Sequence, residues 1–534
     1  MARLKILSSD DFNKLYKLPS LGDNDRPFVF ELDEQDKAYL DSFNDIPKKI
    51  DYVLQVGFFR ITQFFHAFTF QGIRQDTWYV IKTFFPAEKF PKKQVSKRYH
   101  YDNRSAILKK YSMSIYSSQN KAKATRYAKE LIKQHAAPKY VFDSLLEYFH
   151  QHKIVRPSYT TLQEMVSDAL NNEKTRLSNK IYTLMDKPLR ESLANFLEKD
   201  ELFYQLTTVK KDQKDFTTGE INASVKKHQF LTTLYQQSIE IIKKLDISEQ
   251  NIMHYADLAV YHTVYGLRAM KRKNLSRLYL MCYAHYRYLK ISDHLINSFA
   301  HKVNYYKGEG EAYQAEAIYK IKDEDKDHRN AAAAILSLVN NKKVADNEIR
   351  KKSYEIVPQE KFQQFIQKIK KPNFTPEFYR WQYYGENAST IKLNTRAAFK
   401  VLDFKSKNKA LQTAITFMKD HYASNKAFGT YQFKDVPIDF IPKALRRHVI
   451  KKTKNEKNNK KTKCINADRY EFMLYLHIED GIKNGSVTIY NSLSYRSLND
   501  ELHPEQDWDK NKTSIIKGLE NKLLATNKQA SLNS

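Results

Sequence analysis

The chain has 534 residues, with 90 Lys and Arg against 61 Asp and Glu, which gives a formal net charge of +29 at pH 7. At roughly 100 to 200 residues per domain, this length supports several domains with cores of their own and excludes a mini-protein. The excess of positive charge indicates a polyanionic partner, and nucleic acid is the first candidate. An AT-rich genome would raise the Lys content, but it would not by itself produce so large an excess.

Gly contributes only 12 residues, while Leu, Ala, Lys and aromatic residues are abundant. This composition predicts a mainly α, multidomain helical fold with few tight turns. Cys282 and Cys464 are far apart in the sequence, which argues against a disulfide framework and a Cys-based zinc site. We see no signal-peptide pattern and no run of 18 apolar residues, so we expect a cytoplasmic protein that does not enter a membrane.

Residues 1–120 are predicted to form a first helical DNA-binding module. Apolar residues between Ile50 and Ile61 recur at near-helical spacing, which predicts one buried helix. Six phenylalanines follow between Phe58 and Phe70. We assign them to the core rather than to a platform for stacking bases, because aromatic rings bury large apolar areas.

Residues 92–133 carry twelve Lys and Arg against two acidic residues, with tyrosines between them. Lys and Arg side chains neutralise phosphates, while tyrosine rings and hydroxyls contact sugars and base edges. A merely solvated charged surface would usually carry both signs, so we predict contact with DNA or RNA. The predicted contact residues are Lys97, Arg98, His100, Arg104, Lys109, Lys110, Lys121, Lys123 and Arg126.

Residues 121–175 are predicted to form a second, helix-turn-helix-like DNA-binding module, because three amphipathic segments follow one another at 124–132, 142–149 and 162–170. Pro157 blocks backward extension of the third helix, and Thr161 with Glu164 predicts a capping box. The exposed start of this helix is predicted to offer polar side chains to phosphates or base edges. The alternative is that its Ser and Thr residues only cap the helix. The residues concerned are Arg156, Ser158, Tyr159, Thr160, Thr161 and Gln163.

The remainder of the chain is predicted to be mostly scaffold. Residues 176–345 contain long helices, including 221–244 and 257–302, with Cys282 as a packed core thiol. Residues 346–450 are predicted to form a helical dimerisation or scaffold region, and 451–465 a mobile basic loop that is either solvated or clamped onto DNA. In the α+β segment 466–525, Asn466 caps a helix that Gly485 ends before a short strand at 487–490. Residues 526–534 form a polar tail.

Three stretches resemble the Tn-three family of replicative bacterial transposases. The first, VSKRYHYDNRSAILKKY at 95–111, continues into ATRYA at 124–128 and KIVRP at 153–157 and resembles the end-binding region. The second, LSRLYLMCYAHYRYLKISDHLI at 275–296, is similar to the long central helices. The third, DRYEF at 468–472 with GSVTIYNSLSYR at 485–496 and on to DW at 507–508, resembles the segment before the catalytic domain. The resemblance implies two modules for the terminal inverted repeats, which are double-stranded DNA, and a scaffold that could support a homodimer.

In that family an RNase H-like domain follows, in which three carboxylates hold two divalent metals. The sequence ends at Ser534, before such a domain. We therefore expect no catalysis by this chain alone and no cofactor, since the divalent metal would belong to the missing catalytic domain, which a separate polypeptide could supply. A displaced triad of Asp435, Asp439 and Glu471 is not expected, because two-metal chemistry needs acids held close together on a rigid sheet.

The sequence thus favours specific DNA binding at transposon ends without strand transfer. One alternative is a basic helical scaffold that binds RNA or acidic partners. Another is an intact enzyme whose chemistry the motifs do not reveal, although the P-loop, H-E-x-x-H and G-x-S-x-G patterns are missing from the sequence.

Overall fold

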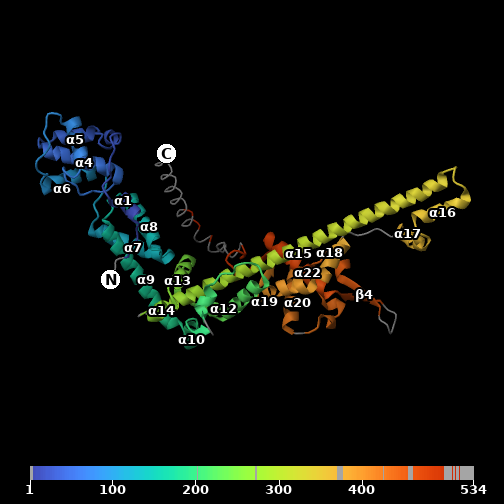
Figure 1. Ribbon diagram of the computed structural model, residues 1–534. Helices are drawn as coiled ribbons and strands as arrows, with labels where there is room; N and C mark the ends of the chain where they lie inside the picture. Colours follow the sequence, from blue (N-terminus) through green and yellow to red (C-terminus); the bar gives the residue numbers. More distant parts are fainter. Residues whose placement is uncertain are drawn as a thin grey trace. The chain divides into compact units, whose positions relative to one another are not determined.

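The structure is a computed structural model that describes residues 4–200, 203–270, 273–369, 377–424, 426–454 and 461–497, with Trp508, Lys512 and Ile516. The described residues are mainly helical, which confirms the predicted fold class (Figure 1). The chain divides into two compact units, Met1–Thr208 with Leu234–Tyr286 and Val209–Thr233 with Arg287–Ser534. No helix in the described ranges is both long and apolar enough to cross a membrane.

Helices α2, α3, α5 and α6 pack around α4, which is the buried helix that the apolar spacing predicts. Asp45 caps α4, because its side chain accepts a hydrogen bond from the Lys48 amide, and Pro47 lies in the first turn. Phe58, Phe59 and Phe70 are buried, as assigned from the sequence. The helices are α1 (Ser9–Tyr16), α2 (Arg26–Val29), α3 (Glu34–Asp41), α4 (Ile46–Thr62), α5 (Arg74–Phe84) and α6 (Lys97–Lys110).

The three amphipathic segments form α7 (Ser118–Gln134), α8 (Pro138–Gln151) and α9 (Tyr159–Leu184), which pack on one another. The predicted capping box at Thr161 is wrong. Ser158 is the N-cap of α9 instead, and its hydroxyl accepts from the Thr161 amide at 3.3 Å. The rest of this unit includes α10 (Lys187–Asn195), β1 (Lys199–Asp200), β2 (Phe203–Tyr204), α13 (Glu249–Tyr261) and α14 (Val264–Ala269), while α11 (Gln205–Lys210) ends in the other unit.

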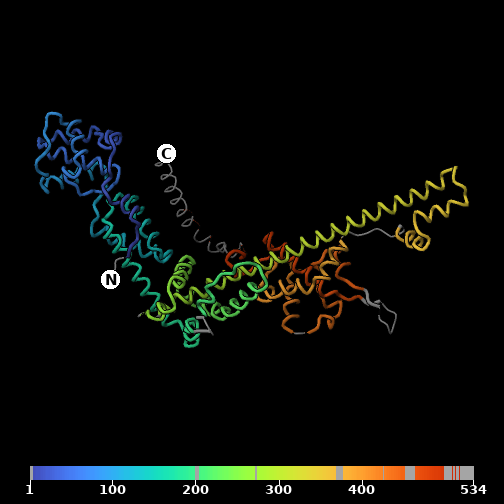
Figure 2. The backbone as a smooth tube through the Cα atoms, in the orientation of Figure 1, coloured from blue at the N-terminus to red at the C-terminus, as the bar shows by residue number. Residues whose placement is uncertain are grey.

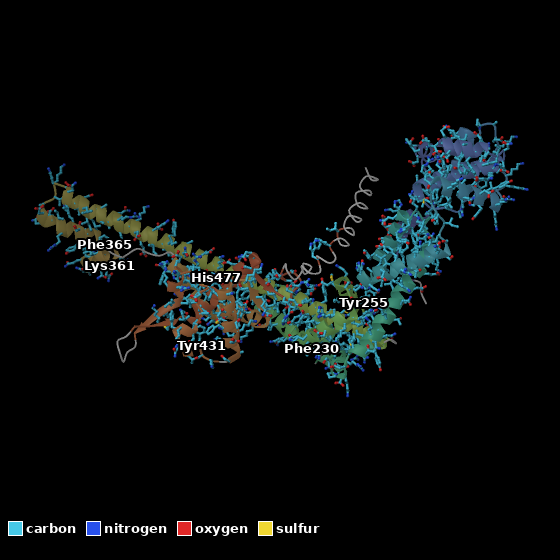
Figure 3. All side chains as sticks on the ribbon, turned by 180° about the vertical axis from the view of Figure 1, so that it is seen from behind. Phe230, Tyr255, Lys361, Phe365, Tyr431 and His477 are labelled. Carbon is cyan, nitrogen blue, oxygen red and sulfur yellow. The ribbon has the colours of Figure 1, made fainter. Side chains whose placement is uncertain are left out.

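Two long helices, α12 (Thr218–Leu245) and α15 (Lys273–Asn340), contribute residues to both units (Figure 2). The single helix predicted over 257–302 is wrong, because Thr263 starts the separate helix α14 by accepting from the Gly266 amide. In the first unit, Tyr255 of α13 (Figure 3) stacks on Tyr279 of α15, with ring centroids 5.8 Å apart. Cys282 is fully buried, as predicted, and burial raises the pKa of its thiol.

The second unit is built around α22, whose Tyr470 and Tyr475 are fully buried. Tyr431 and His477 are both labelled in Figure 3. The Tyr431 ring contacts Phe417 at a centroid distance of 5.0 Å, and the His477 ring contacts Phe440 at 5.4 Å. Its helices after α15 are α16 (Asp346–Ile356), α17 (Phe362–Ile369), α18 (Glu377–Glu386), α19 (Ala388–Val401), α20 (Lys409–Ser424), α21 (Arg446–Val449) and α22 (Ala467–Lys483), with 3-10 turns η1 (Gln359–Lys361), η2 (Phe428–Thr430) and η3 (Phe433–Asp435).

The end of the described chain follows the sequence prediction closely. Asn466 caps α22 by accepting from the Arg469 amide, and Gly485 adopts a φ of 71° that favours glycine. The strand that follows, β6 (Val487–Ile489), pairs antiparallel with β3 (Phe404–Ser406). The polar tail 526–534 lies outside the described residues.

The segment predicted as a basic loop is a two-stranded ribbon over most of its length. β4 (Ile450–Lys454) pairs antiparallel with β5 (Lys461–Ile465). The loop prediction is therefore wrong for these strands, and residues 455–460 lie outside the described residues. Lys alternates with Thr at 452–454 and at 461–463, which is compatible with a strand and which a reading of charge alone does not detect.

Candidate nucleic-acid interface

His100 belongs to an internal polar network between α4 and α6. The carboxylate of Asp51 is fully buried, accepts from the Asn103 amide nitrogen at 2.9 Å, and lies 3.0 Å from His100 Nδ1. A buried carboxylate needs such partners, because leaving it without them costs several kcal/mol. The structure thus places His100 against α4 rather than on the predicted contact surface.

Lys110 and Arg104 also point toward the core of their domain. The Lys110 ammonium lies 2.7 Å from Asp33 and 2.6 Å from the buried Asp36, and its hydrogen bond lowers the pKa of Asp33 to about 2. The Arg104 guanidinium lies over the Phe65 ring at 5.0 Å. Both cations have intramolecular roles, which the count of basic residues does not reveal.

The outward face of α6 presents the remaining predicted cations of this helix. Lys97, Arg98 and Lys109 are exposed, and Tyr101 between them is 65% exposed. The first turn of α6 contains Lys97 and Arg98 but no acidic residue, although the helix dipole favours acidic residues there. These two cations therefore do not stabilise the helix end, and they remain available to an external anion.

Helix α7 carries further exposed cations. Lys121, Lys123, Arg126 and Lys129 are exposed, and none of the four forms an ion pair within the described part of the chain. Ser117 is the N-cap of their helix, and its hydroxyl accepts from the Asn120 amide at 3.3 Å. A shallow depression on this helix is lined by Ser118, Lys121, Ala122, Thr125, Arg126 and Lys129.

The depression adds residues that the sequence analysis did not single out as contacts. Lys129 and Thr125 follow Lys121 at intervals of four residues, so they lie on the same side of α7. Helical spacing could have identified them, whereas the number of charges could not. We refer to Lys121, Arg126 and Lys129, which line this depression, as the α7 basic face. Lys123 is exposed too, but it lies on another side of the helix, because residues two apart do not share a face.

The start of α9 is covered by the N-terminal segment of the chain, which contradicts its predicted exposure. The Tyr159 hydroxyl accepts from the Ile6 amide at 3.1 Å, and the Gln163 side chain donates to the Leu4 carbonyl at 2.6 Å. Gln163 is only 8% exposed. The Arg156 guanidinium donates to the Leu15 carbonyl and lies over the rings of Tyr16 and Phe64.

The hydroxyl residues at this helix start divide between two roles. Ser158 caps α9, and its hydroxyl lies 2.9 Å from that of Thr161. For Ser158 and Thr161, the structure therefore agrees with the alternative given in the sequence analysis, in which the Ser and Thr residues cap the helix and do not contact DNA. Thr160 is exposed. Of the six residues predicted here, Thr160 is the one that is both exposed and not engaged in the cap.

The acidic residues considered as a displaced catalytic triad are dispersed among other contacts. Glu471 is bound by the Arg396 guanidinium at 2.6 and 3.0 Å and accepts from the Tyr475 hydroxyl at 2.7 Å. Asp439 pairs with Arg446 at 3.1 Å. In the described ranges, no three His, Cys, Asp or Glu side chains are grouped so that they could hold a metal ion.

Residues 6–169 match a family described as "Domain of unknown function (DUF4158)". This domain is known to occur in Tn-three family transposases. The matched range contains α1 to α8 and the first part of α9, so it includes both the outward face of α6 and the α7 basic face.

Proposed function

We propose that this chain binds double-stranded DNA at the terminal inverted repeats of a class II transposon, as the end-recognition part of a transposase. The strand-transfer chemistry would be supplied by a catalytic domain or by a separate polypeptide. The observation that carries the proposal is the α7 basic face, because its three exposed cations have no acidic partner among the described residues. Unneutralised cations on a rigid helix are suited to phosphate contacts.

Two further observations support this proposal. The outward face of α6 adds Lys97, Arg98 and Lys109, with Tyr101 between them. The domain that matches residues 6–169 occurs in transposases of the family that the sequence resembles. The net charge of +29 also favours a polyanion over a neutral partner.

Fluorescence anisotropy of the purified chain tests the proposal. It would compare a duplex of the terminal inverted repeat adjoining the gene with a shuffled duplex at several salt concentrations, because a strongly basic protein binds any DNA in dilute buffer. We expect preference for the repeat to persist near physiological salt. Equal binding that disappears with salt, or tighter binding to RNA, would contradict end recognition.

Two single substitutions on α7 locate the contact. Lys121→Ala should lower the slope of log K against log salt by about one, because one phosphate contact is lost. Lys133→Ala is the matched control, since it removes the same charge from the same helix, but Lys133 lies 3.4 Å from Glu130. A slope lowered equally by both variants would show that net charge, rather than the α7 basic face, determines binding.

A further inference from the structure

Helix α6, labelled in Figure 1, carries four exposed residues that follow one another at intervals of three or four positions. This spacing places them along one side of the helix. The buried residues of α6, Asn103 and Ile107, lie on the opposite side, and Asn103 donates to Asp51 of α4. The four exposed residues, which we call the α6 stripe, are Arg98, Tyr101, Ser105 and Lys109.

Both ends of the α6 stripe are positively charged. Neither Arg98 nor Lys109 forms an ion pair within the described part of the chain. Asp102 is the one acidic residue in the sequence of α6, and it lies beside the stripe. Its carboxylate is 3.7 Å from the Lys48 ammonium of α4, which already provides it with a cation. The two end cations therefore remain available to phosphates.

The middle of the α6 stripe consists of two hydroxyl-bearing side chains. Tyr101 is largely exposed, and among the described residues its ring stacks on no other aromatic ring. Tyr99 of the same helix differs, because the Lys48 ammonium lies over its ring at 4.7 Å. A hydroxyl both donates and accepts hydrogen bonds, so Tyr101 and Ser105 present groups that can bond the edges of bases.

The order of residues in the α6 stripe fits the dimensions of the DNA major groove. Arg98 and Lys109 are 11 positions apart, which corresponds to about 16 Å along the helix axis. The major groove admits an α-helix and is about 12 Å wide. A helix that crosses it obliquely would bring the two cations to the phosphates at its rims. Tyr101 and Ser105 would then face the base edges.

The other two helices considered for DNA contact are less suited to reading bases. At the start of α9, Tyr159 and Gln163 are bound to the backbone of the N-terminal segment, which leaves Thr160 exposed. The α7 basic face consists of cations, and phosphate contacts carry no sequence information. Of these three helices, α6 is the one whose exposed surface has cations at both ends and hydroxyls between them.

We propose that α6 enters the major groove of the inverted repeat, where Tyr101 and Ser105 read base edges. Arg98 and Lys109 contact the phosphates on the two sides of the groove. The inference rests on the proposed function, because it assigns sequence reading to one part of that interface. It makes Tyr101 and Ser105 specificity-determining residues, whereas the α7 basic face supplies affinity that does not depend on sequence.

Hydroxyl removal in the full chain tests this inference. Tyr101→Phe and Ser105→Ala should each lower the preference for the inverted repeat over a shuffled duplex by about three- to tenfold, because one base contact is lost. Binding to the shuffled duplex and the salt slope should not change, since no charge is removed. Tyr99→Phe is the matched control, because it removes the same atom two residues away, and it should leave the preference unchanged.

Substitution of the end cations should give the opposite result. Arg98→Ala and Lys109→Ala should weaken binding to both duplexes by the same factor, and each should lower the salt slope by about one. If these two variants lost the preference while Tyr101→Phe and Ser105→Ala retained it, the assignment of roles along the α6 stripe would be wrong.

Thermal unfolding and a second ligand complete the test. Tyr101 and Ser105 are exposed, so the melting temperature of their variants should stay the same. A lower melting temperature together with lost preference would indicate a structural role and overturn the inference. Equal weakening on duplex RNA would also overturn it, because the major groove of A-form RNA is too narrow for side chains to read.

The same measurements separate this inference from the proposed function. If the unsubstituted chain prefers the repeat and Tyr101→Phe and Ser105→Ala retain that preference, the inference fails and end recognition stands. A drop in preference that is as large in Tyr99→Phe has the same consequence. If the unsubstituted chain binds both duplexes equally near physiological salt, end recognition fails, and the assignment of base reading to α6 fails with it.

Discussion

At the residue scale, Lys109 and Lys110 show that position around a helix decides what a cation does. The two are adjacent in α6, and each step along an α-helix turns the side chain by about 100°. Lys109 is exposed, whereas Lys110 reaches Asp33 and the fully buried Asp36. The sequence analysis assigned both to DNA, and the structure separates them.

This difference predicts opposite phenotypes for two single substitutions. Lys110→Ala should lower the free energy of unfolding by about 3 kcal/mol, because it removes a cation from a buried carboxylate. Lys109→Ala should change stability by less than about 0.5 kcal/mol and lower the salt slope of DNA binding by about one. Urea unfolding and anisotropy measure the two effects, and a destabilised Lys109→Ala with an unaffected Lys110→Ala would contradict the assignment.

At the element scale, the start of α9 serves as an attachment site for the N-terminal segment. Tyr159 and Gln163 bind the backbone of residues 4–7, and Phe12 of α1 contacts the Tyr159 ring at 5.5 Å. The helix-turn-helix resemblance would assign this position to base reading. Tyr159 and Gln163 are used within the chain instead, whereas Thr160 stays exposed.

Gln163→Ala and Thr160→Ala test this role at neighbouring positions. Gln163→Ala should leave the preference for the inverted repeat unchanged, and it should speed trypsin cleavage at Lys5 and Lys14, because the segment loses a partly buried hydrogen bond. The exposed Thr160→Ala should not change the cleavage rate. Loss of repeat preference in Gln163→Ala with normal cleavage would restore a base-reading role to α9.

At the scale of the whole molecule, each unit contains a histidine, half-buried in the first and buried in the second, that makes its stability depend on pH. His285 in the first unit lies 2.8 Å from the Ser238 hydroxyl, and His228 in the second lies 3.1 Å from that of Ser292. Burial lowers the pKa of both to about 4. Both imidazoles are therefore neutral near pH 7.

Acidification should destabilise both units over the same range. The folded-state pKa lies below the usual value of 6.5, so protons bind the unfolded state first as the pH falls. The stability contribution is complete above about pH 6.5 and decreases toward pH 4, by up to about 3 kcal/mol for each histidine. His228→Gln and His285→Asn should flatten this dependence in urea unfolding at pH 7.5 and 5. An unchanged dependence in both variants would contradict the assignment.

The fold was largely predictable where local patterns suffice. Apolar spacing located α4, α7, α8, α9 and α22, and the cap at Asn466 and the turn at Gly485 follow from local backbone chemistry. The break between α13 and α15 was missed, because the apolar pattern continues across it while Thr263 starts a new helix. The pairing of β4 with β5 was missed because a run of lysines carries little strand signal.

The sequence by itself determined the helical class, the basic character and the region from which nucleic-acid contact is proposed. Composition and periodicity are local properties, and they are readable without tertiary contacts. Only the tertiary structure decided which cations are outward, because Lys110, Arg104 and His100 are bound by residues more than 45 positions away. In the folded chain, Gln163 is also bound to the carbonyl of Leu4, which lies 159 residues earlier in the sequence. Such long-range burial determines which residues of a basic sequence remain exposed to an external partner.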